Sequence, residues 1–501
     1  MAAEHFDVLI VGAGLSGIDA AYHLQKLCPN KTYVIVEQRD RIGGTWDLFR
    51  YPGVRSDSDM LTMGYSFRPW THPRSISPGA DIRNYIEETA RGEGIDRHIR
   101  FRHQIKRASW SSEEAKWTIE AVRNGAEAVT LKCNFLFSCA GYYRYSAGYT
   151  PEFPGIERFR GRVVHPQAWP EDLDYSGKRV VVIGSGATAV TLIPAMASTA
   201  AHVTMLQRSP GYMISLPGQD AIANRLRRVL PMTWAYRLSR WKNVAFVTLV
   251  YQLSQRFPNF VKNGLIRQVR SHLGPDYDVA THFTPRYKPW EQRMCLVPDS
   301  DMFLALKSGR ASVVTDQIET ITEKGILLRS GRELEADILV TATGLVLEAF
   351  GGIELEVDGS RIDVSKALAY KGVMYSGVPN LASVFGYINA SWTLKADLIC
   401  NYVCRLLNLM DRKRVRQVTP RAGEETAAAM FVEKFTPGYF MRGLAKWPKQ
   451  GSKAPWRVNQ NYFRDAVALK WSSIDDSALE FSNPPPASDD TVRRELVEAA
   501  R

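Results

Sequence analysis

The stretch Phe6-Asp-Val-Leu-Ile-Val-Gly12-Ala-Gly14-Leu-Ser-Gly17 decides the fold of this chain. Its first six residues are a mostly apolar run that ends in glycine, which is typical of a buried strand in a parallel sheet. A helix is expected from about Leu15, and a second strand over Thr32–Glu37. A strand, a glycine-rich turn and a helix in this order predict a dinucleotide-binding unit.

Each glycine of this turn has a physical task. Gly12 permits the tight turn, Gly14 lets the backbone approach a pyrophosphate, and Gly17 lets the helix pack closely. The helix N-terminus then offers backbone N–H groups to the phosphates. Glu37, twenty residues after Gly17, is placed to accept hydrogen bonds from ribose hydroxyls. Ser16 belongs to the same predicted site.

The same arrangement returns later in the chain. Arg179–Ile183 is a predicted strand, a helix is expected to about Thr199, and His202–Gln207 is the next strand. The second turn comprises Gly184, Ser185, Gly186, Ala187, Thr188 and Ala189. This internal repeat predicts an α/β fold with two Rossmann-like dinucleotide-binding domains.

The two units differ where the ribose is expected. Arg208, nineteen residues after Ala189, replaces the acid at the end of the second strand. An acid would repel a ribose 2′-phosphate, whereas arginine binds one through paired hydrogen bonds. Thr188 and Gln207 lie on the same rim. We therefore expect FAD at the first site and NADPH at the second, with hydride transfer between them.

With 501 residues the chain is too long for one compact core. We expect the first part of an FAD domain over residues 1–145 and an NADP domain over 146–345. The second domain carries a helical insertion at about 211–290. Residues 346–501 are expected to complete the FAD domain and to end in a polar tail.

The composition indicates a cytoplasmic protein with free thiols. The N-terminus has no charged and apolar regions of a signal peptide, and the longest apolar run is too short to span a bilayer. The six cysteines form no Cys-x-x-Cys pair and no metal-ligand spacing. No metal site is predicted.

The formal charge of +12 is concentrated in one segment. Residues 221–272 hold ten Lys or Arg and no Asp or Glu, interleaved with aromatic residues at helical spacing. Three interpretations stay open. The segment is a solvated lid over a substrate channel, a peripheral contact with the inner face of the cell membrane, or, least favoured, a nucleic-acid face. No nucleic-acid partner is expected.

Two further motifs resemble those of a known family. Phe159–Pro170 reads F-x-G-x-x-x-H-x-x-x-W-P, and Gly43–Asp57 fits every fixed position of [A/G]-G-x-W-x-x-x-x-[F/Y]-P-[G/M]-x-x-x-D. Both resemble patterns of class B flavin monooxygenases of the Baeyer–Villiger type. The segments Pro289–Pro298, Gly386–Asp397 and Pro455–Asn461 resemble later landmarks of the ethionamide-activating branch of this family.

The resemblance implies a mechanism. NADPH reduces FAD, O2 adds at the flavin C4a atom, and the peroxide attacks a ketone to give an ester or lactone. Arg293 aligns with the arginine that stabilises the anionic oxygen, and Asp57 with the acid that orients it. Gln292 stands where some members have a lysine that holds the 2′-phosphate. The remaining predicted cofactor contacts are Gly44, Thr45, Trp46, Asp47, Leu48, Arg55, Ser56, Asp57 and Ile105.

Two details of the resemblance leave alternatives open. His165 and Trp169 either couple domain movement to the cofactors or are simply packed. Ser391 is a candidate N-cap for a helix beginning near Thr393, whose N-terminus is expected to face the flavin ring.

The expected substrate is a small hydrophobic ketone. The alternative is a sulfide or thioamide, which an S- or N-oxygenating flavin monooxygenase accepts. A flavin-bearing redox sensor without turnover is the non-enzyme alternative, and the pairing of Arg293 with Asp57 argues against it.

Overall fold

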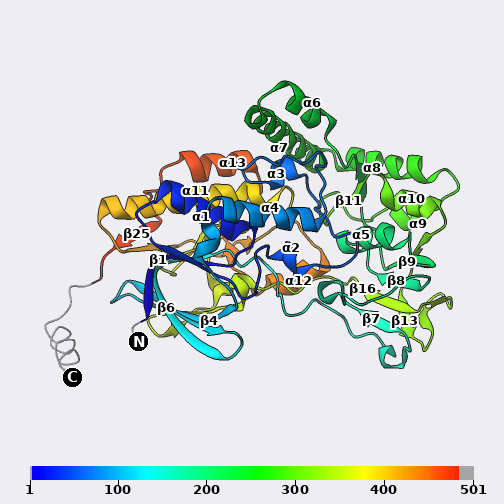
Figure 1. Cartoon of the computed structure of the whole chain (residues 1–501), viewed down its shortest axis with the longest axis horizontal. Helices are drawn as coiled ribbons and strands as arrows, with labels where there is room; N and C mark the ends of the chain where they lie inside the picture. The colour runs from blue at the N-terminus through cyan, green and yellow to red at the C-terminus, as the bar shows by residue number, and fades with distance from the viewer. Residues whose placement is uncertain (1–2, 485–501) are drawn as a thin grey trace.

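A computed structural model describes residues 3–484 of the chain. Figure 1 shows two sheet-containing parts along the long axis, with both ends of the sequence in one and the middle of the sequence in the other. The expected polar tail, residues 485–501, lies outside the described residues. The chain therefore leaves the first part, forms the second part with its middle residues, and then returns to the first part.

The first part contains a mixed sheet in the order β18-β17-β4-β5-β6-β1-β2-β3, with β21 also paired to β6. Its centre is parallel, because β1 pairs with β2 on one side and with β6 on the other in the parallel sense. The strands are β1 (Glu4–Val11), β2 (Tyr33–Val36), β3 (Ile99–Arg100), β4 (His103–Ser111), β5 (Lys116–Arg123), β6 (Glu127–Ser138), β17 (Glu354–Val357), β18 (Ser360–Arg361) and β21 (Leu381–Ser383).

The second part contains a parallel sheet in the order β12-β9-β8-β16-β7. Its strands are β7 (Arg162–Val164), β8 (Arg179–Ile183), β9 (His202–Gln207), β12 (Ala311–Thr315) and β16 (Ile338–Thr341). The bounds of β8 and β9 agree with the strands predicted from the sequence. The expected domain boundaries at 145 and 345 lie between the strands of the two sheets and stay predictions.

Short two- and three-stranded ladders complete the described strands. They are β10 (Met213–Leu216) with β11 (Cys295–Pro298), β13 (Ile318–Ile321) with β14 (Gly325–Leu328) and β15 (Glu333–Glu335), β19 (Ala369–Tyr370) with β20 (Met374–Tyr375), β22 (Gln417–Pro420) with β25 (Leu479–Ser482), and β23 (Ala429–Met430) with β24 (Lys449–Gln450). The β10–β11 pair brackets the helical insertion.

One helix follows each glycine-rich turn, α1 (Leu15–Leu27) after the first and α5 (Ala187–Met196) after the second, and further helices complete the fold. These are α2 (Thr45–Leu48), α3 (Met60–Met63), α4 (Gly79–Gly92), α6 (Ala221–Val229), α7 (Met232–Arg256), α8 (Pro258–Leu273), α9 (Val279–Phe283), α10 (Asp301–Lys307), α11 (Trp392–Lys413), α12 (Gly438–Leu444) and α13 (Tyr462–Ala466). Helix α5 contains Pro194 and ends at Met196, before the expected end near Thr199.

Each sheet has its own buried core. Helices α1 and α11 lie together on one face of the first sheet, where Ile18, Ile399 and Val403 are fully buried. In the second part α5 packs on the sheet through Val190 and Ile193. The buried faces fix the register of both β-α-β units, and with it the position of the two turns.

The helical insertion packs on the first part of the chain rather than only on its own sheet. Arg240 Nη1 donates to the backbone oxygens of Leu61, Thr62 and Gly64 at 2.7–3.1 Å. Among residues 3–484 no helix is both long enough and apolar enough to cross a membrane. Figure 1 shows α6 and α7 standing out from the body above α3.

Candidate active site between two nucleotide turns

One cavity of about 950 Å³ runs between the two glycine-rich turns. Both sheets contribute to its wall, because β1 and β8 each end in a turn at its edge. The predicted residues that line it are Gly12, Gly14, Ser16, Glu37, Gly44, Thr45, Trp46, Arg55, Asp57, Ile105, Gly184, Ser185, Gly186, Ala187, Thr188, Gln207, Arg208 and Arg293. Residues more than 280 positions apart in the sequence thus face one space.

Five of the predicted cofactor residues do not line the cavity: Gly17, Asp47, Leu48, Ser56 and Ala189. A side chain on Gly17 would place its Cβ 1.9 Å from the Gly12 oxygen, so this glycine serves close packing. Asp47 is 1% exposed and pairs with Arg39 at 2.6 Å and Arg50 at 2.7 Å.

The other three are likewise engaged in the fold. Ser56 is buried, and its Oγ accepts from the backbone N–H of Ser77 at 3.1 Å. Ala189 is fully buried under the second sheet, and Leu48 ends the short helix α2. The motif positions therefore divide into those that face the cavity and those that hold its wall in place.

Glu37 holds the first turn in shape. Its carboxylate accepts from the backbone N–H of Ala13 at 2.7 Å and of Arg39 at 2.8 Å. Burial raises the pKa of Glu37, while these two N–H donors lower it. The carboxylate joins the turn after β1 to the loop after β2 and still borders the cavity.

Both turn helices begin at the cavity, and no side chain caps their first backbone N–H groups. The N-cap residues are Gly14 of α1 and Gly186 of α5, and glycine has no side chain to cap the first backbone N–H groups. A Cβ added at Gly186 would meet nothing within 4 Å. These N–H groups and the positive helix ends fit the phosphates of two dinucleotides.

The rim of the second turn carries a free cation. Arg208 is exposed, lines the cavity and forms no ion pair with any residue between 3 and 484. The adjacent Gln207 amide donates to the His282 oxygen at 2.8 Å and to Thr315 Oγ1 at 2.9 Å. Gln207 Oε1 is buried without a hydrogen-bond partner in the described structure.

Arg293 and Asp57 meet at the cavity, as the motif alignment predicted for the catalytic pair. Arg293 Nη2 donates to Asp57 Oδ2 at 2.5 Å, and Nη1 donates to the Ile388 oxygen at 3.2 Å. Burial by itself lowers the pKa of Arg293, but the Asp57 carboxylate outweighs it and the pKa is raised. About a third of each side chain, 32% and 38%, is open to the cavity. The guanidinium therefore keeps its charge where a ligand can meet it.

A strained loop presents Arg293. Trp290 has φ +71°, a left-handed conformation that is costly for a bulky residue. The Glu291 oxygen accepts from the Thr436 N–H at 2.7 Å, and Glu291 Oε2 accepts from the Lys288 N–H at 2.9 Å. The contact with Thr436 brings the segment before α12 to the cavity.

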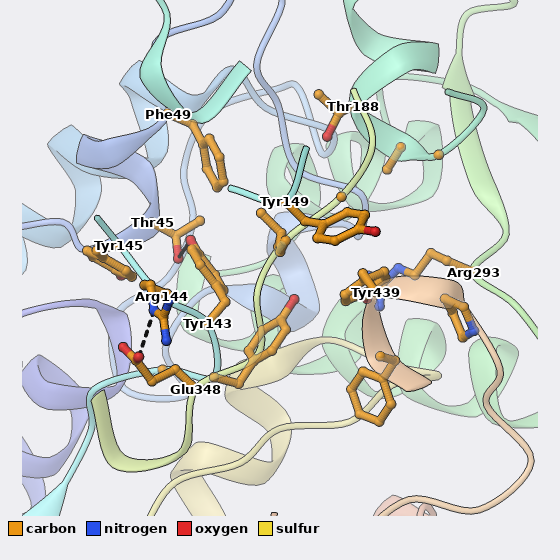
Figure 2. Close-up of a pocket in the computed structure, with 18 of the residues that line it drawn as sticks. Thr45, Phe49, Tyr143, Arg144, Tyr145, Tyr149, Thr188, Arg293, Glu348 and Tyr439 are labelled. Atoms are coloured by element: carbon orange, nitrogen blue, oxygen red, sulfur yellow. Dashed lines mark hydrogen bonds and ion pairs between the residues drawn. The ribbon is translucent and has the colours of Figure 1, made fainter. Parts of the chain in front are cut away.

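An aromatic and basic part of the cavity wall was not predicted from the sequence. Figure 2 shows Tyr143, Tyr145 and Tyr149 on one strip of chain, with Tyr439 beside Arg293. Tyr143 donates to Thr45 Oγ1 at 2.7 Å, and the Arg442 guanidinium lies 3.4 Å from the Tyr149 ring centre. The signal was present as four tyrosines within residues 142–149, shortly after β6.

His165 and Trp169 lie outside the cavity wall. His165 Nδ1 accepts from the Gln167 N–H at 3.1 Å, and burial lowers the pKa of His165. The Gln167 amide donates to the oxygens of Arg144 and Tyr145 at 2.8 and 3.0 Å. The motif thus ties the strip of chain between the two sheets to β7, and neither His165 nor Trp169 lines the cavity.

The N-terminus of α11 reaches the first turn, but its cap differs from the expectation. Ser391 occupies the N-cap position without capping a backbone N–H through its side chain. Its hydroxyl instead lies 2.6 Å from Thr62 Oγ1. Trp392 Nε1 donates to Ser16 Oγ at 2.8 Å, which holds the starts of α11 and α1 together.

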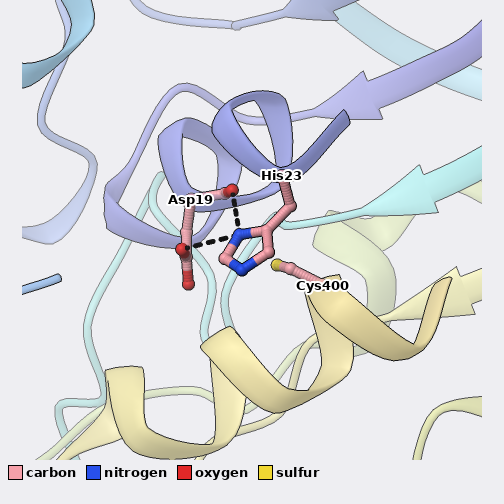
Figure 3. Close-up of side chains that lie close together, drawn as sticks. All are labelled: Asp19, His23 and Cys400. Atoms are coloured by element: carbon pink, nitrogen blue, oxygen red, sulfur yellow. Dashed lines mark hydrogen bonds and ion pairs between the residues drawn. The ribbon is translucent and has the colours of Figure 1, made fainter. Parts of the chain in front are cut away.

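A second titratable group lies outside the cavity (Figure 3). Asp19, His23 and Cys400 are buried between α1 and α11, with donor atoms within 4.8 Å of one another. His23 Nδ1 lies 3.3 Å from Asp19 Oδ1 and 3.0 Å from the Asp19 backbone oxygen. Asp19 thus gives the buried His23 ring a polar partner.

This group is expected to make stability depend on pH. Burial lowers the pKa of His23, but Asp19 outweighs it and raises the pKa from 6.5 to about 9. The folded chain therefore binds the proton more tightly, so this stabilisation is complete below pH 6.5 and is lost as the pH rises through about 9. Burial also raises the pKa of Asp19 to about 6. The stabilisation from this proton is likewise lost as the pH rises, but it is lost near pH 6.

We expect His23→Gln to remove up to about 3 kcal/mol of stability at pH 6.5 and to flatten its decline toward pH 9. Thermal unfolding of both chains at the two pH values measures this. His72→Gln is the control, because His72 is exposed and has no acidic partner among the described residues. An equal loss of thermal stability between pH 6.5 and pH 9 in His23→Gln and in the parent would contradict the assignment of this pH dependence to His23.

Three comparisons with known proteins agree on the family. Residues 5–389 match the model of the flavin-binding monooxygenase-like family. The chain is 53% identical over 484 residues to FAD-containing monooxygenase EthA of Mycobacterium tuberculosis, across 96% of this chain and 99% of that protein. It is 47% identical to the probable FAD-binding monooxygenase AlmA of Acinetobacter baylyi, across 98% of each chain.

Solved structures share the fold. An oxidized steroid monooxygenase bound to NADP matches with a TM-score of 0.73 at 22% identity, over 96% of this chain and 100% of that one. Cyclohexanone monooxygenase from Rhodococcus sp. Phi1 bound to NADP+ matches with a TM-score of 0.74 at 19% identity, with the same coverage. The expected α/β class is confirmed.

Fold and cavity define a two-sheet protein with a pair of nucleotide turns facing one space. The chain belongs to the flavin-binding monooxygenase-like family. The expectation of a flavin monooxygenase, drawn from Gly43–Asp57 and Phe159–Pro170, is confirmed at this level.

Proposed function

We propose that this chain is an FAD- and NADPH-dependent Baeyer–Villiger monooxygenase. It converts a hydrophobic ketone, O2, NADPH and a proton into an ester or lactone, water and NADP+. The observation that carries the proposal is the Arg293–Asp57 pair, which lies on the cavity between the two nucleotide turns. A guanidinium at this place stabilises negative charge on oxygen without donating its proton.

FAD is assigned to the first turn and NADPH to the second. Around FAD, the N-terminus of α1 takes the pyrophosphate and Glu37 takes the ribose, with Ser16, Gly44 and Thr45 beside them. At the second turn the N-terminus of α5 takes the phosphates, and Arg208 takes the ribose 2′-phosphate. EthA and AlmA, whose names record FAD, support the first assignment.

The bound flavin, once reduced by the nicotinamide, supplies the activation of O2. The chain's own residues then act on charge and position. Arg293 holds the negative charge that develops on oxygen at the substrate carbon, and Asp57 fixes the direction of its guanidinium. The strained loop at Trp290 keeps that guanidinium at the cavity before any ligand arrives.

The wall of the cavity favours an apolar substrate. Aromatic rings surround the space next to Arg293, and they exclude water from the reacting centre. They are Tyr142, Phe385, Phe435, Tyr439 and Phe440. A hydrophobic ketone buries its chain against these rings and turns its carbonyl toward the guanidinium.

The proposal predicts which products the holoenzyme makes. Purified holoenzyme is incubated with NADPH, O2 and a panel of linear, cyclic and aryl ketones, sulfides and thioamides. We expect esters or lactones from hydrophobic ketones, with one oxygen atom taken from labelled O2. Sulfoxides without any ester would overturn the proposal in favour of an S-oxygenating enzyme. Flavin reduction without any oxygenated product would favour a redox sensor.

A further inference from the structure

Helices α6, α7 and α8 form a surface that the oxygenation reaction does not use. We call these helices, residues 221–273, the helical platform. None of its residues lines the cavity. Its outer face combines apolar and cationic side chains, which is unusual for a surface exposed only to water.

Four exposed apolar side chains lie along one face of α7. Their spacing is three or four residues, or two helical turns, which places them on the same side of the helix. They are Trp234, Leu238, Trp241 and Leu249, with exposed fractions of 58%, 48%, 50% and 57%. Ala245 continues the same stripe. The opposite face, which includes Tyr236 and Ser239, is buried. Helix α7 therefore presents apolar side chains on a face that the protein does not cover.

The neighbouring elements extend this face. Ile222 and Val229 of α6 are 57% and 69% exposed, and Phe260 of α8 is 76% exposed. The Trp241 ring stacks on Phe463 of α13, with ring centroids 6.3 Å apart. Val467 and Trp471 follow Phe463 at four-residue spacing and are also exposed. Figure 1 shows α7 and α13 on the same side of the molecule.

The ten cations of the platform divide into two groups. Four hold it to the body: Arg227 and Arg240 donate to backbone oxygens of residues 61–72, Lys262 donates to the Pro285 oxygen, and Lys242 pairs with Asp220. The other six are exposed and form no ion pair with any residue between 3 and 484. They are Arg225, Arg228, Arg237, Arg256, Arg267 and Arg270.

We propose that the helical platform docks on the surface of an anionic phospholipid bilayer. Exposed tryptophan, phenylalanine and leucine enter the interface between headgroups and acyl chains, while the six free arginines bind lipid phosphates. The absence of any acid from residues 221–272 removes the repulsion that would oppose this contact. Charge complementarity therefore selects an anionic membrane as the occupant.

The buried side of the same helix borders the active site. Val244 of α7 packs in one cluster with Tyr387, a residue of the cavity wall. Tyr251 meets the ring of Trp290, three residues before Arg293, at a centroid distance of 5.7 Å. Docking would thus place the cavity wall next to the lipid phase that dissolves apolar molecules. The docking proposal is argued only from the exposed side chains of the helical platform, so it does not depend on which oxygenation the cavity performs.

Vesicle flotation of the full-length holoenzyme tests the proposal. Vesicles of phosphatidylcholine alone are compared with vesicles that also contain phosphatidylglycerol, each at low and high salt. We expect binding to the anionic vesicles at low salt, and weaker binding at high salt because ions screen the arginines. No binding to the anionic vesicles at either salt would overturn the proposal.

Two sets of variants separate the apolar and cationic contributions. Trp234→Ser with Leu249→Ser is expected to weaken binding about tenfold or more, and Leu304→Ser on α10, where Leu304 is 60% exposed, is its matched control. Arg225→Gln with Arg228→Gln is expected to weaken binding to anionic vesicles about 30-fold, with the exposed Arg332→Gln as control. Oxidation of a water-soluble ketone should be unchanged in all of them.

Two outcomes of these variants would contradict membrane docking. Vesicle binding that survives both double substitutions undiminished would place the contact elsewhere. A parent chain that forms dimers in sedimentation equilibrium, ignores vesicles and becomes monomeric with Trp234→Ser and Leu249→Ser would assign the platform to a second copy of this chain.

Discussion

Replacing Arg293 with alanine is expected to slow ester formation about 100- to 1,000-fold while FAD stays bound, because one preorganised donor to a developing oxyanion is lost. The side chain lies on the cavity, is charged and is fixed by Asp57 at 2.5 Å. It belongs to neither glycine-rich turn, so the flavin keeps its phosphate and ribose contacts. Steady-state ester formation, measured together with flavin absorbance, gives both quantities.

Companion variants distinguish chemistry from folding. Arg293→Lys keeps the charge but lacks the planar fork, so we expect an intermediate rate. Asp57→Asn keeps a hydrogen-bond acceptor and should lower the rate less than Arg293→Ala. Arg361→Ala removes an arginine of a surface ion pair with Glu354 and should change nothing. An unchanged ester yield in Arg293→Ala would assign the role to another cation of the cavity.

Arg208→Ala is expected to raise the KM for NADPH about 10- to 100-fold and to leave the KM for NADH nearly unchanged, because a charge-assisted contact with the 2′-phosphate is lost. Arg208 is exposed on the cavity rim and forms no ion pair with residues 3–484, so its removal leaves no partner buried. Cofactor oxidation at varied NADPH and NADH concentrations measures the two constants.

Two variants separate the effect of the positive charge of Arg208 from that of its planar guanidinium group. Arg208→Lys retains a point charge and is expected to lose less NADPH preference than Arg208→Ala. Gln292 also lines the cavity, and Gln292→Lys is expected to strengthen the NADPH preference if it lies near the 2′-phosphate. Equal loss of both nicotinamide cofactors in Arg208→Ala would show that this residue holds the turn rather than the phosphate.

Local sequence patterns predicted much of the site. A buried parallel strand, a glycine-rich turn and a helix start each leave a recognisable pattern in the sequence, so Gly12, Gly14, Gly184 and Gly186 were predicted without a structure. The motif resemblance supplied Arg293 and Asp57, whose meeting at 2.5 Å the structure then described. These features depend on short stretches of chain.

Local patterns failed where one residue type serves several purposes. Asp47 and Ser56 stand in the same motif as Asp57, yet Asp47 is buried against Arg39 and Arg50 and does not reach the cavity. Ser391 has the residue type and position of an N-cap, but Thr62 takes its hydroxyl. In each case a partner distant in sequence decided which hydrogen bond formed, and no local pattern records that partner.

The sequence by itself determined the two β-α-β units, the opposite charges of Glu37 and Arg208 that follow their second strands, and the excess of cations in residues 221–272. The tertiary structure alone decided that both turns face one cavity, that tyrosines from residues 142–149 and Tyr439 complete its wall, and which cations of the helical platform point outward. The physical reason is the distance in sequence between the residues that decide each feature. Strand burial and turn geometry are set by neighbouring residues, whereas a cavity wall and an uncovered face depend on how distant segments pack.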